Sequence, residues 1–196
     1  MFAVNDIFKS FGDKSVLNGA SLDVSGETVA LMGASGSGKT TLLRIVAGLE
    51  KADGGDVYIE GRTAVVFAEP RLFPNVRVLE NVVCVADPKT PKAESVAAAR
   101  EILGELLLFD ALNAYPSELS SGMAARVALA RALMVDADNY LLDEPFGALD
   151  DAVRETVVSA VKKRLEGKSV LLITHSESDA KALASRTLIL SEGKIR

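Results

Sequence analysis

Short apolar runs separated by glycine-containing turns dominate the first third of the chain. Each run is only a few residues long, and turns such as Gly12-Asp13 and Ser25-Gly26 lie between them. Runs of this length bounded by turn residues are typical of β-strands. The pattern predicts strands at residues 2–4, 7–8, 15–17, 20–24, 28–32, 56–59 and 64–67.

From about residue 70 to 133 the apolar spacing becomes that of helices. Thr90 and Pro91 predict a helix start, because threonine is a good N-cap and proline fits the first helical position. Apolar residues then recur at three- and four-residue steps and predict one buried stripe: Val96, Ala99, Leu103, Leu106 and Leu107. A second helix is predicted to begin near Gly122.

Strands and helices alternate again in the last third of the chain. Apolar runs at residues 140–142 and 170–173 predict buried strands, and residues 151–165 predict a helix between them. Two more strands are predicted at residues 187–190 and 194–195. This alternation indicates an α/β fold.

The length of 196 residues, with 48% hydrophobic and 25% charged residues, fits one folded domain. We expect a single domain over residues 1–196. Residues 1–69 and about 134–196 would form an α/β nucleotide-binding core, and residues from about 70 to 133 an inserted helical subdomain.

Charge and hydropathy argue against several classes of protein. The net charge of −5 disfavours a nucleic-acid binder, which usually has a basic face. The N-terminus lacks a signal-peptide pattern, and no apolar run approaches the roughly 20 residues that cross a bilayer. We therefore expect a cytoplasmic protein. The single cysteine, Cys84, allows no internal disulfide, and its apolar neighbours predict a small buried side chain.

Residues 33–40, Gly-Ala-Ser-Gly-Ser-Gly-Lys-Thr, form the strongest functional motif. They lie between a predicted strand and a segment with helical spacing. Glycines let backbone N–H groups converge on phosphates, and the helix N-terminus adds partial positive charge. Lys39 can reach the β- and γ-phosphates, and the Thr40 hydroxyl can bind Mg²⁺. A glycine-rich surface turn is the alternative, but the flanking elements favour a nucleoside triphosphate site.

Two acids and the only histidine follow the next apolar strands. In α/β sheets, ligands bind outside the carboxyl ends of the strands. Asp143 can therefore hold Mg²⁺, and Glu144 can orient or deprotonate the attacking water. His175 can donate a hydrogen bond to the γ-phosphate. A solvated acidic turn and an ordinary half-buried histidine are the alternatives, and the phosphate loop favours the catalytic interpretation.

With these motifs in this order, the chain resembles an ABC-type ATPase, the nucleotide-binding subunit of an ABC transporter, over nearly its whole length. Residues 33–40 match the Walker A loop, residues 142–145 the Walker B motif with its catalytic glutamate, and residues 146–150 the D-loop. His175 matches the switch histidine. Phe11 matches the aromatic residue that stacks on adenine, with an ordinary strand aromatic as the alternative. The resemblance implies an α/β P-loop NTPase (RecA-like) core, an N-terminal antiparallel β subdomain and an inserted α-helical subdomain.

Residues 119–133 resemble the family's signature region, which places Ser120 and Gly122 at a helix N-terminus. Such a terminus is a second anion site. The resemblance implies a homodimer or pseudo-homodimer in which each ATP lies between one subunit's Walker A loop and the partner's signature. It also implies transmembrane permease subunits as partners, and no nucleic acid is expected.

ATP and Mg²⁺ are the cofactors that the resemblance implies. The residues expected to contact ATP are Phe11, Gly33, Ser35, Gly36, Ser37, Gly38, Lys39, Thr40, Thr41, Ser120, Gly122 and Asp150. Thr40 and Asp143 are the expected metal ligands. Lys39, Glu144 and His175 are the expected catalytic residues.

Residues 69–74 and 78–82, together with Met123, resemble the nitrate, sulfonate and taurine importer subgroup most closely. Two positions depart from the family pattern. Ala68 stands where the family usually has a glutamine that contacts Mg²⁺ or the attacking water, so we expect slower hydrolysis. Ser121 occupies the position at which the family's signature has its first glycine. Its β-carbon costs about 1–2 kcal/mol if φ must be positive, and otherwise its hydroxyl is an added donor.

We therefore expect a subunit that binds and hydrolyses ATP and couples dimer closure to a permease, for import of a small solute. It would lie on the inner face of the cell membrane, held by the permease. The alternative is an ABC-type ATPase with weak turnover that acts as a regulatory or nucleic-acid- or ribosome-associated module.

Overall fold

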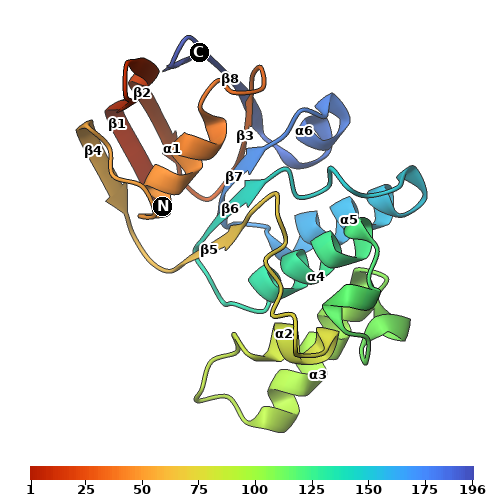
Figure 1. Ribbon diagram of the computed structural model, residues 1–196. Coiled ribbons are helices and arrows are strands. Elements are labelled where there is room, and N and C mark those ends of the chain that lie inside the picture. The colour runs from red at the N-terminus through yellow and green to blue at the C-terminus, as the bar shows by residue number, and fades with distance from the viewer. The chain divides into compact units, whose positions relative to one another are not determined.

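The apolar runs of the first third fold into an antiparallel sheet. In the computed structural model, which describes residues 1–196, β1 (Phe2–Phe11), β2 (Lys14–Val24) and β4 (Gly54–Ile59) pair in the order β2-β1-β4 (Figure 1). The register shifts between Val4 and Ile7, where Asp6 has a φ of 47°. The two short runs predicted at residues 2–4 and 7–8 are thus one strand with an irregularity.

A second sheet of six strands has the order β5-β6-β7-β3-β8-β9. Its members are β3 (Thr28–Met32), β5 (Thr63–Val66), β6 (Asn139–Asp143), β7 (Ser169–Ile173), β8 (Arg186–Ser191) and β9 (Lys194–Ile195). β3 pairs in parallel with β7 and β8, and β6 pairs in parallel with β7. β6 and β7 are buried over their whole length, which explains their continuous apolar runs.

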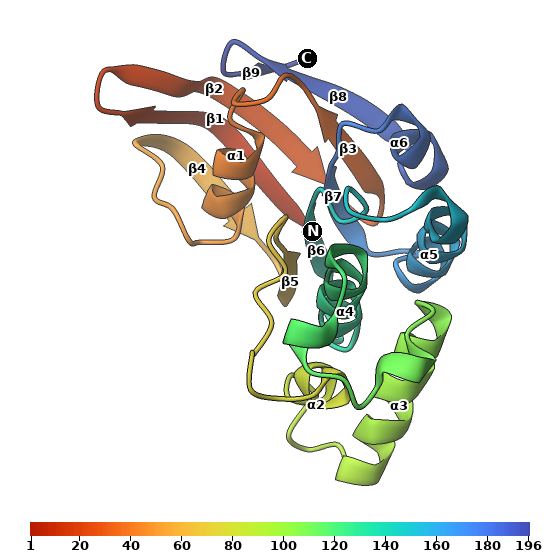
Figure 2. The same cartoon turned by 45° about the vertical axis from the view of Figure 1, so that its right-hand side comes forward.

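The register of this sheet brings three strand ends to one level. Leu31 and Asp143 both pair with Ile173, so the segments that leave β3, β6 and β7 begin close together (Figure 2). Helix α1 (Lys39–Val46) follows β3, and its apolar residues are buried. Helix α6 (Glu177–Leu183), which the sequence did not predict, follows β7.

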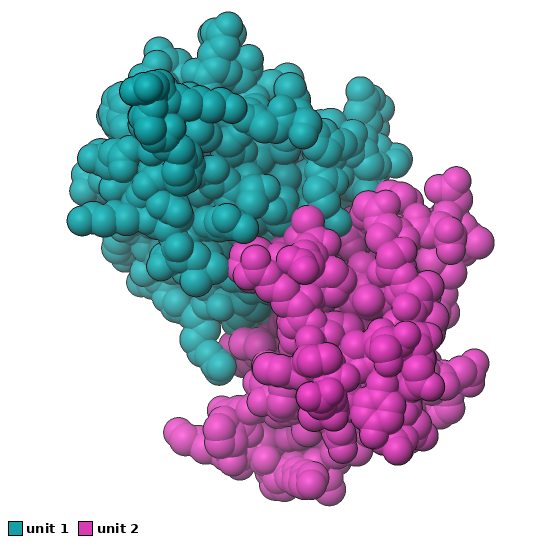
Figure 3. Space-filling view, viewed as in Figure 1, with its two compact units in different colours: residues 1–65, 137–144, 165–196 teal, residues 66–136, 145–164 magenta.

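The chain forms two compact units, coloured separately in Figure 3. Residues 1–65, 137–144 and 165–196 form the first unit, which contains both sheets, and residues 66–136 and 145–164 form the second. The second unit is helical and contains α2 (Val78–Val83), α3 (Lys92–Glu105), α4 (Ser121–Leu133), α5 (Asp151–Arg164) and short 3-10 helices at Phe109–Ala111 and Pro116–Glu118.

Helix α5 was expected in the nucleotide-binding core but belongs to the helical unit. It packs against α3, and Arg164 of α5 forms ion pairs with Glu101, at 2.9 Å, and with Glu105. α5 belongs to the helical unit because of its contacts with helices that are distant in sequence. The hydrophobic pattern of a single segment does not predict such contacts. No helix in the structure has both the length and the apolar character needed to cross a membrane.

Three details of the helical unit differ from the sequence prediction. Pro91 is the N-cap of α3 rather than its first helical residue. Leu107 is exposed, because α3 ends at Glu105 and a φ of 57° turns the chain there. Cys84 is exposed rather than buried. It is the C-cap of α2, whose buried residues are Val78, Asn81 and Val82, so position 84 falls outside the buried stripe.

Candidate functional site

The loop at residues 33–38, between β3 and α1, has two positions at which there is no room for a β-carbon. A Cβ at Gly33, where φ is 147°, would lie 2.3 Å from the Leu190 carbonyl oxygen. A Cβ at Gly38, the N-cap of α1, would lie 2.9 Å from Cγ1 of Val16. Both glycines are therefore required by close packing as well as by positive φ. A Cβ at Gly36 would meet nothing within 4 Å, so this part of the loop is open.

Polar groups gather inside this loop. Lys39 is only 6% exposed, and its Nζ donates to the carbonyl oxygens of Gly33 at 2.8 Å and Ala34 at 2.9 Å. Burial lowers the pKa of Lys39, and the carboxylates of Glu144 and Asp143 oppose that shift. The buried hydroxyl oxygen of Ser37 has no protein partner. A lysine and an unpartnered hydroxyl at a helix N-terminus fit a phosphate group.

Thr40 of α1 and Asp143 of β6 meet beside the loop. The Thr40 hydroxyl donates to Oδ2 of Asp143 at 2.8 Å, and Asp143 is 3% exposed. Two oxygen donors of this kind fit Mg²⁺, which typically takes one or two protein ligands together with phosphate oxygens and water. The structure has no cluster of three or more His, Cys, Asp and Glu side chains that could hold a metal ion. Phosphate oxygens and water would supply the remaining ligands of a cation bound at this point.

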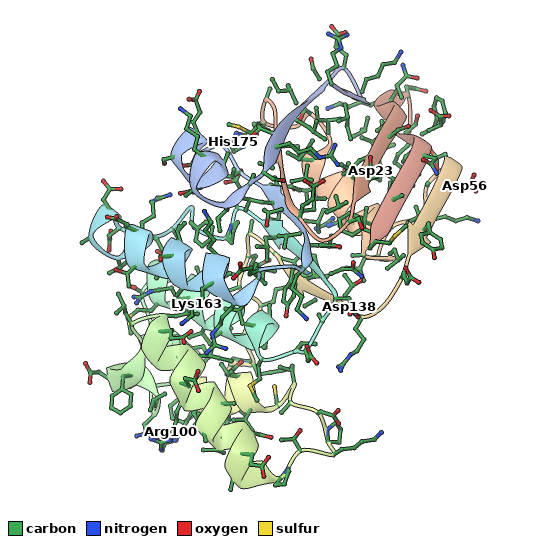
Figure 4. The ribbon with its side chains drawn as sticks, turned by 180° about the vertical axis from the view of Figure 1, so that it is seen from behind. Asp23, Asp56, Arg100, Asp138, Lys163 and His175 are labelled. Atoms are coloured by element: carbon green, nitrogen blue, oxygen red, sulfur yellow. The ribbon has the colours of Figure 1, made fainter.

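Glu144 and His175 follow neighbouring strands and contact each other. Glu144 has a φ of 48°, and its N–H donates to the Ile173 carbonyl at 3.0 Å. His175, labelled in Figure 4, has its Nε2 at 3.3 Å from Oε1 of Glu144, and its backbone N–H donates to Oε2 at 3.4 Å. Burial raises the pKa of Glu144, and His175 opposes that shift. Backbone strain and a raised pKa are both common at catalytic carboxylates.

Phe11 lies at the end of β1, where it pairs with Lys14 of β2 next to the turn. Its side chain is half exposed, at 50%. The Nζ of Lys9 lies over the ring, 5.0 Å from its centroid. Phe11 is thus a surface aromatic in the unit that carries the phosphate loop.

The predicted signature residues form the start of α4 in the second unit. Ser120 is the N-cap, and its Oγ accepts a hydrogen bond of 3.2 Å from the Met123 N–H. Ser121 is not among the residues with positive φ, so its β-carbon carries no strain of that kind. A Cβ at Gly122 would lie 2.8 Å from the Ala148 carbonyl oxygen. Gly122 is therefore needed for close packing against the segment that was matched to the D-loop.

Arg126, to which the sequence motifs assigned no role, connects the start of α4 to the end of α3. It is 9% exposed, its Nε donates to the Gly122 carbonyl, and one terminal nitrogen donates to the Leu106 and Leu107 carbonyls. Burial lowers its pKa, and Asp150 opposes that shift. The sequence feature that could have indicated this role is a charged residue within a predicted apolar helix.

The structure divides the predicted site residues between the two units. Phe11, residues 33–41, Asp143, Glu144 and His175 lie in the first unit, and Ser120, Gly122 and Asp150 lie in the second. Ala68, also in the second unit, is exposed just after β5. The neighbouring Glu69 side chain is 82% exposed and lies 4.0 Å from Arg71.

Comparison with known proteins identifies the family. The family model described as ABC transporter matches residues 17–147. The chain belongs to this family. The aliphatic sulfonates import ATP-binding protein SsuB 3 of Rhodococcus jostii is 46% identical over 195 residues, which cover 97% of this chain and 71% of that protein. The SsuB protein of Corynebacterium glutamicum is 46% identical over 198 residues, covering 98% of this chain and 81% of that protein.

Solved structures of ABC cassettes confirm the fold class. A dimeric structure of the ATP-binding cassette MJ0796 in a post-hydrolysis state, bound to ADP and Pi, has a TM-score of 0.91 and 30% sequence identity. The match covers 100% of this chain and 97% of the MJ0796 chain. A second dimeric structure of the same cassette has a TM-score of 0.92. This ABC protein is accordingly an ATP-binding and ATP-hydrolysing transporter subunit. Its predicted resemblance to the nitrate, sulfonate and taurine importer subgroup is confirmed by these relatives, which are named for sulfonate import.

Proposed function

We propose that this subunit powers the import of a small sulfonate, as one half of an ATPase dimer that drives a membrane permease. Support for import and for the sulfonate comes from relatives named for aliphatic sulfonate import, which match nearly the whole chain. The observation that best supports an ATPase site is that the ends of β3, β6 and β7 lie close together. This arrangement brings the phosphate loop, Asp143, Glu144 and His175 to one edge of a parallel sheet.

In this proposal the loop at residues 33–38 and Lys39 hold the β- and γ-phosphates. Ser35, Ser37 and Thr41 supply further donors around them, and the buried Ser37 hydroxyl gains a partner. Thr40 and Asp143 hold Mg²⁺, which when bound offsets the negative charge of the phosphate oxygens. The positive end of α1 adds to this attraction.

Hydrolysis needs an acceptor for a proton of the attacking water. Glu144 fits this role, because burial raises its pKa and its left-handed backbone fixes the side chain where the strand ends. His175 donates its backbone N–H to Oε2 of Glu144. Its ring is half exposed, with Nε2 3.3 Å from Oε1 of Glu144, so a ring N–H can be offered to a γ-phosphate oxygen. Losing one such preorganised contact raises a barrier by about 2.7–4 kcal/mol.

A second copy is proposed to complete each nucleotide site. The N-terminus of α4 has Ser120 as its N-cap, and this hydroxyl accepts from Met123 while its own proton is free for a phosphate oxygen. Gly122 and the exposed Asp150 belong to the same unit. We propose that these residues reach the γ-phosphate held by the partner subunit's Walker A loop. The dimeric cassette with ADP and Pi is a precedent for the arrangement.

The segment at residues 68–82 is proposed to contact the permease. Asn81 is fully buried, and its amide bonds to backbone groups of Phe73, Val76 and Arg77, which fixes the segment's shape. Phe73 is nevertheless 53% exposed and offers an apolar contact. Through this contact the protein would be held at the cytoplasmic face of the cell membrane.

Reconstitution with its permease tests the proposal. In vesicles, the wild-type protein should support ATP-dependent uptake of a short alkanesulfonate, and Glu144→Gln should bind ATP while its turnover falls by about 10²–10⁴-fold. Glu192→Gln is a matched control, because Glu192 also has a positive φ, of 53°, but lies in an exposed turn. Parental turnover in Glu144→Gln would show that Glu144 is misassigned, and uptake of other solutes only would reject the sulfonate.

A further inference from the structure

Lys9, on β1, is almost buried although it belongs to none of the matched motifs. It is 9% exposed, and its ammonium contacts Oε1 of Glu50 at 2.7 Å, the Lys51 carbonyl at 2.8 Å and Oδ1 of Asp53 at 3.4 Å. The hydrogen bond to Glu50 raises the pKa of Lys9. The side chain is therefore a fixed positive charge at neutral pH, held by three partners.

This fixed charge lies over the ring of Phe11. The Nζ of Lys9 is 5.0 Å from the ring centroid, within the range of a cation–π interaction. Phe11 keeps half of its surface exposed. One face of the ring is thus covered by the ammonium, while exposed ring surface remains for another flat group.

The ring lies on the hairpin that packs against the phosphate loop. Phe11 pairs with Lys14 of β2, and two residues further along β2 Val16 lies so close to Gly38 that a Cβ there would be 2.9 Å from its Cγ1. Figure 2 shows this hairpin of β1 and β2 beside α1, whose N-terminus carries the loop. A nucleotide with its phosphates in the loop would therefore have its base on the side of the hairpin.

We propose that Lys9 is a positioning residue for nucleotide binding, which holds Phe11 from one face and strengthens its stacking on the base at the other. The inference rests on the proposed role of Phe11. A cation on one face of a ring draws electron density from it, which favours stacking of an electron-rich purine opposite. Holding the Phe11 ring in place also reduces the side-chain entropy that is lost when the nucleotide binds, which favours binding.

Calorimetric titration with Mg-ADP and Mg-pyrophosphate tests the inference, since neither ligand is a substrate for hydrolysis and only ADP carries a base. Lys9→Met should weaken ADP binding by about two- to fivefold and leave pyrophosphate binding unchanged. Lys51→Met is the matched control, because it removes an exposed lysine side chain from the same loop. Lys9→Arg keeps a cation and should restore most of the ADP affinity. If Lys9→Met does not fold, Lys9→Gln replaces it with the same expectation.

A double-mutant cycle separates positioning from general distortion. Phe11→Ala should weaken ADP binding by at least about fivefold, and Lys9→Met should then have no further effect. Three results would overturn the inference. Lys9→Met could weaken the binding of ADP and pyrophosphate equally, it could leave ADP binding unchanged, or it could still weaken ADP binding in the Phe11→Ala background. Wild-type affinity for ADP in Phe11→Ala also overturns it while leaving the ATPase proposal intact. A wild-type protein that binds neither ligand refutes both.

Discussion

The Thr40 hydroxyl donates a 2.8 Å hydrogen bond to Oδ2 of Asp143, 103 positions further along the chain. Thr40 is the second residue of α1, and Asp143 is the last residue of β6. The contact forms because the ends of β3 and β6 lie level across β7, with Leu31 and Asp143 both paired with Ile173. Two oxygen atoms that can bind a cation are thereby held together beside the phosphate loop.

Asp143→Asn should abolish most of the effect of Mg²⁺ on ATP affinity. Removing the carboxylate charge weakens a hard cation's site, and we expect the gain in affinity that Mg²⁺ provides to fall at least about tenfold. ATP titrations with Mg²⁺ and with a chelator measure this gain. Thr40→Ser, which keeps the hydroxyl, is the control and should behave as wild type. An unchanged Mg²⁺ effect in Asp143→Asn would remove Asp143 from the metal site.

Glu144→Gln should make the free protein more stable at pH 8 than the wild type. Burial raises the pKa of Glu144 above its ordinary value of 4.5, so the fold favours the protonated carboxyl. The stability from this proton is present below pH 4.5 and is lost as the pH rises through the raised pKa. Urea unfolding at pH 4.5 and pH 8 should show an advantage for Glu144→Gln only at the higher pH. Equal or lower stability of the variant at pH 8 would contradict this.

Gly122→Ala should disrupt the signature end of α4, whereas Ser121→Gly should not. An alanine Cβ at position 122 would lie 2.8 Å from the Ala148 carbonyl, so either the helix start or the segment at residues 146–150 must move. We expect ATPase turnover to fall at least about tenfold, since displacing a positioned group by about 1 Å can cost 10²-fold. Ser121 has no positive φ, so its replacement relieves no strain. Comparable activities of the two variants would reject this account.

Ala68→Gln should raise turnover in the assembled transporter by about 10–100-fold, the range for an outer partner of a metal site. The methyl group of Ala68 can bind neither metal nor water. Glu69 does not replace the missing amide, because its side chain is 82% exposed and lies 4.0 Å from Arg71. Steady-state ATPase measurements with the permease give the readout, and Ala68→Leu controls for size. No increase in Ala68→Gln would show that the alanine does not limit this enzyme.

Much of the site could be predicted from sequence because its chemistry is local. A strand, a glycine turn and a helix start are contiguous at residues 28–46, and the acid pair directly follows a buried strand. The expected roles of these residues in nucleotide binding remain predictions. The role of Arg126 was not predicted because its partners, the carbonyls of Leu106 and Leu107, belong to the end of another helix.

By itself, the sequence determined the order of most strands and helices and the place of the glycine loop between β3 and α1, since hydrophobic period and glycine placement act within a few neighbours. Only the tertiary structure decided which side chains meet. It placed α5 with α3 through Arg164, left Cys84 exposed and put the ammonium of Lys9 over Phe11. These outcomes depend on packing between segments far apart in the chain, where burial and charge pairing are settled by the whole fold.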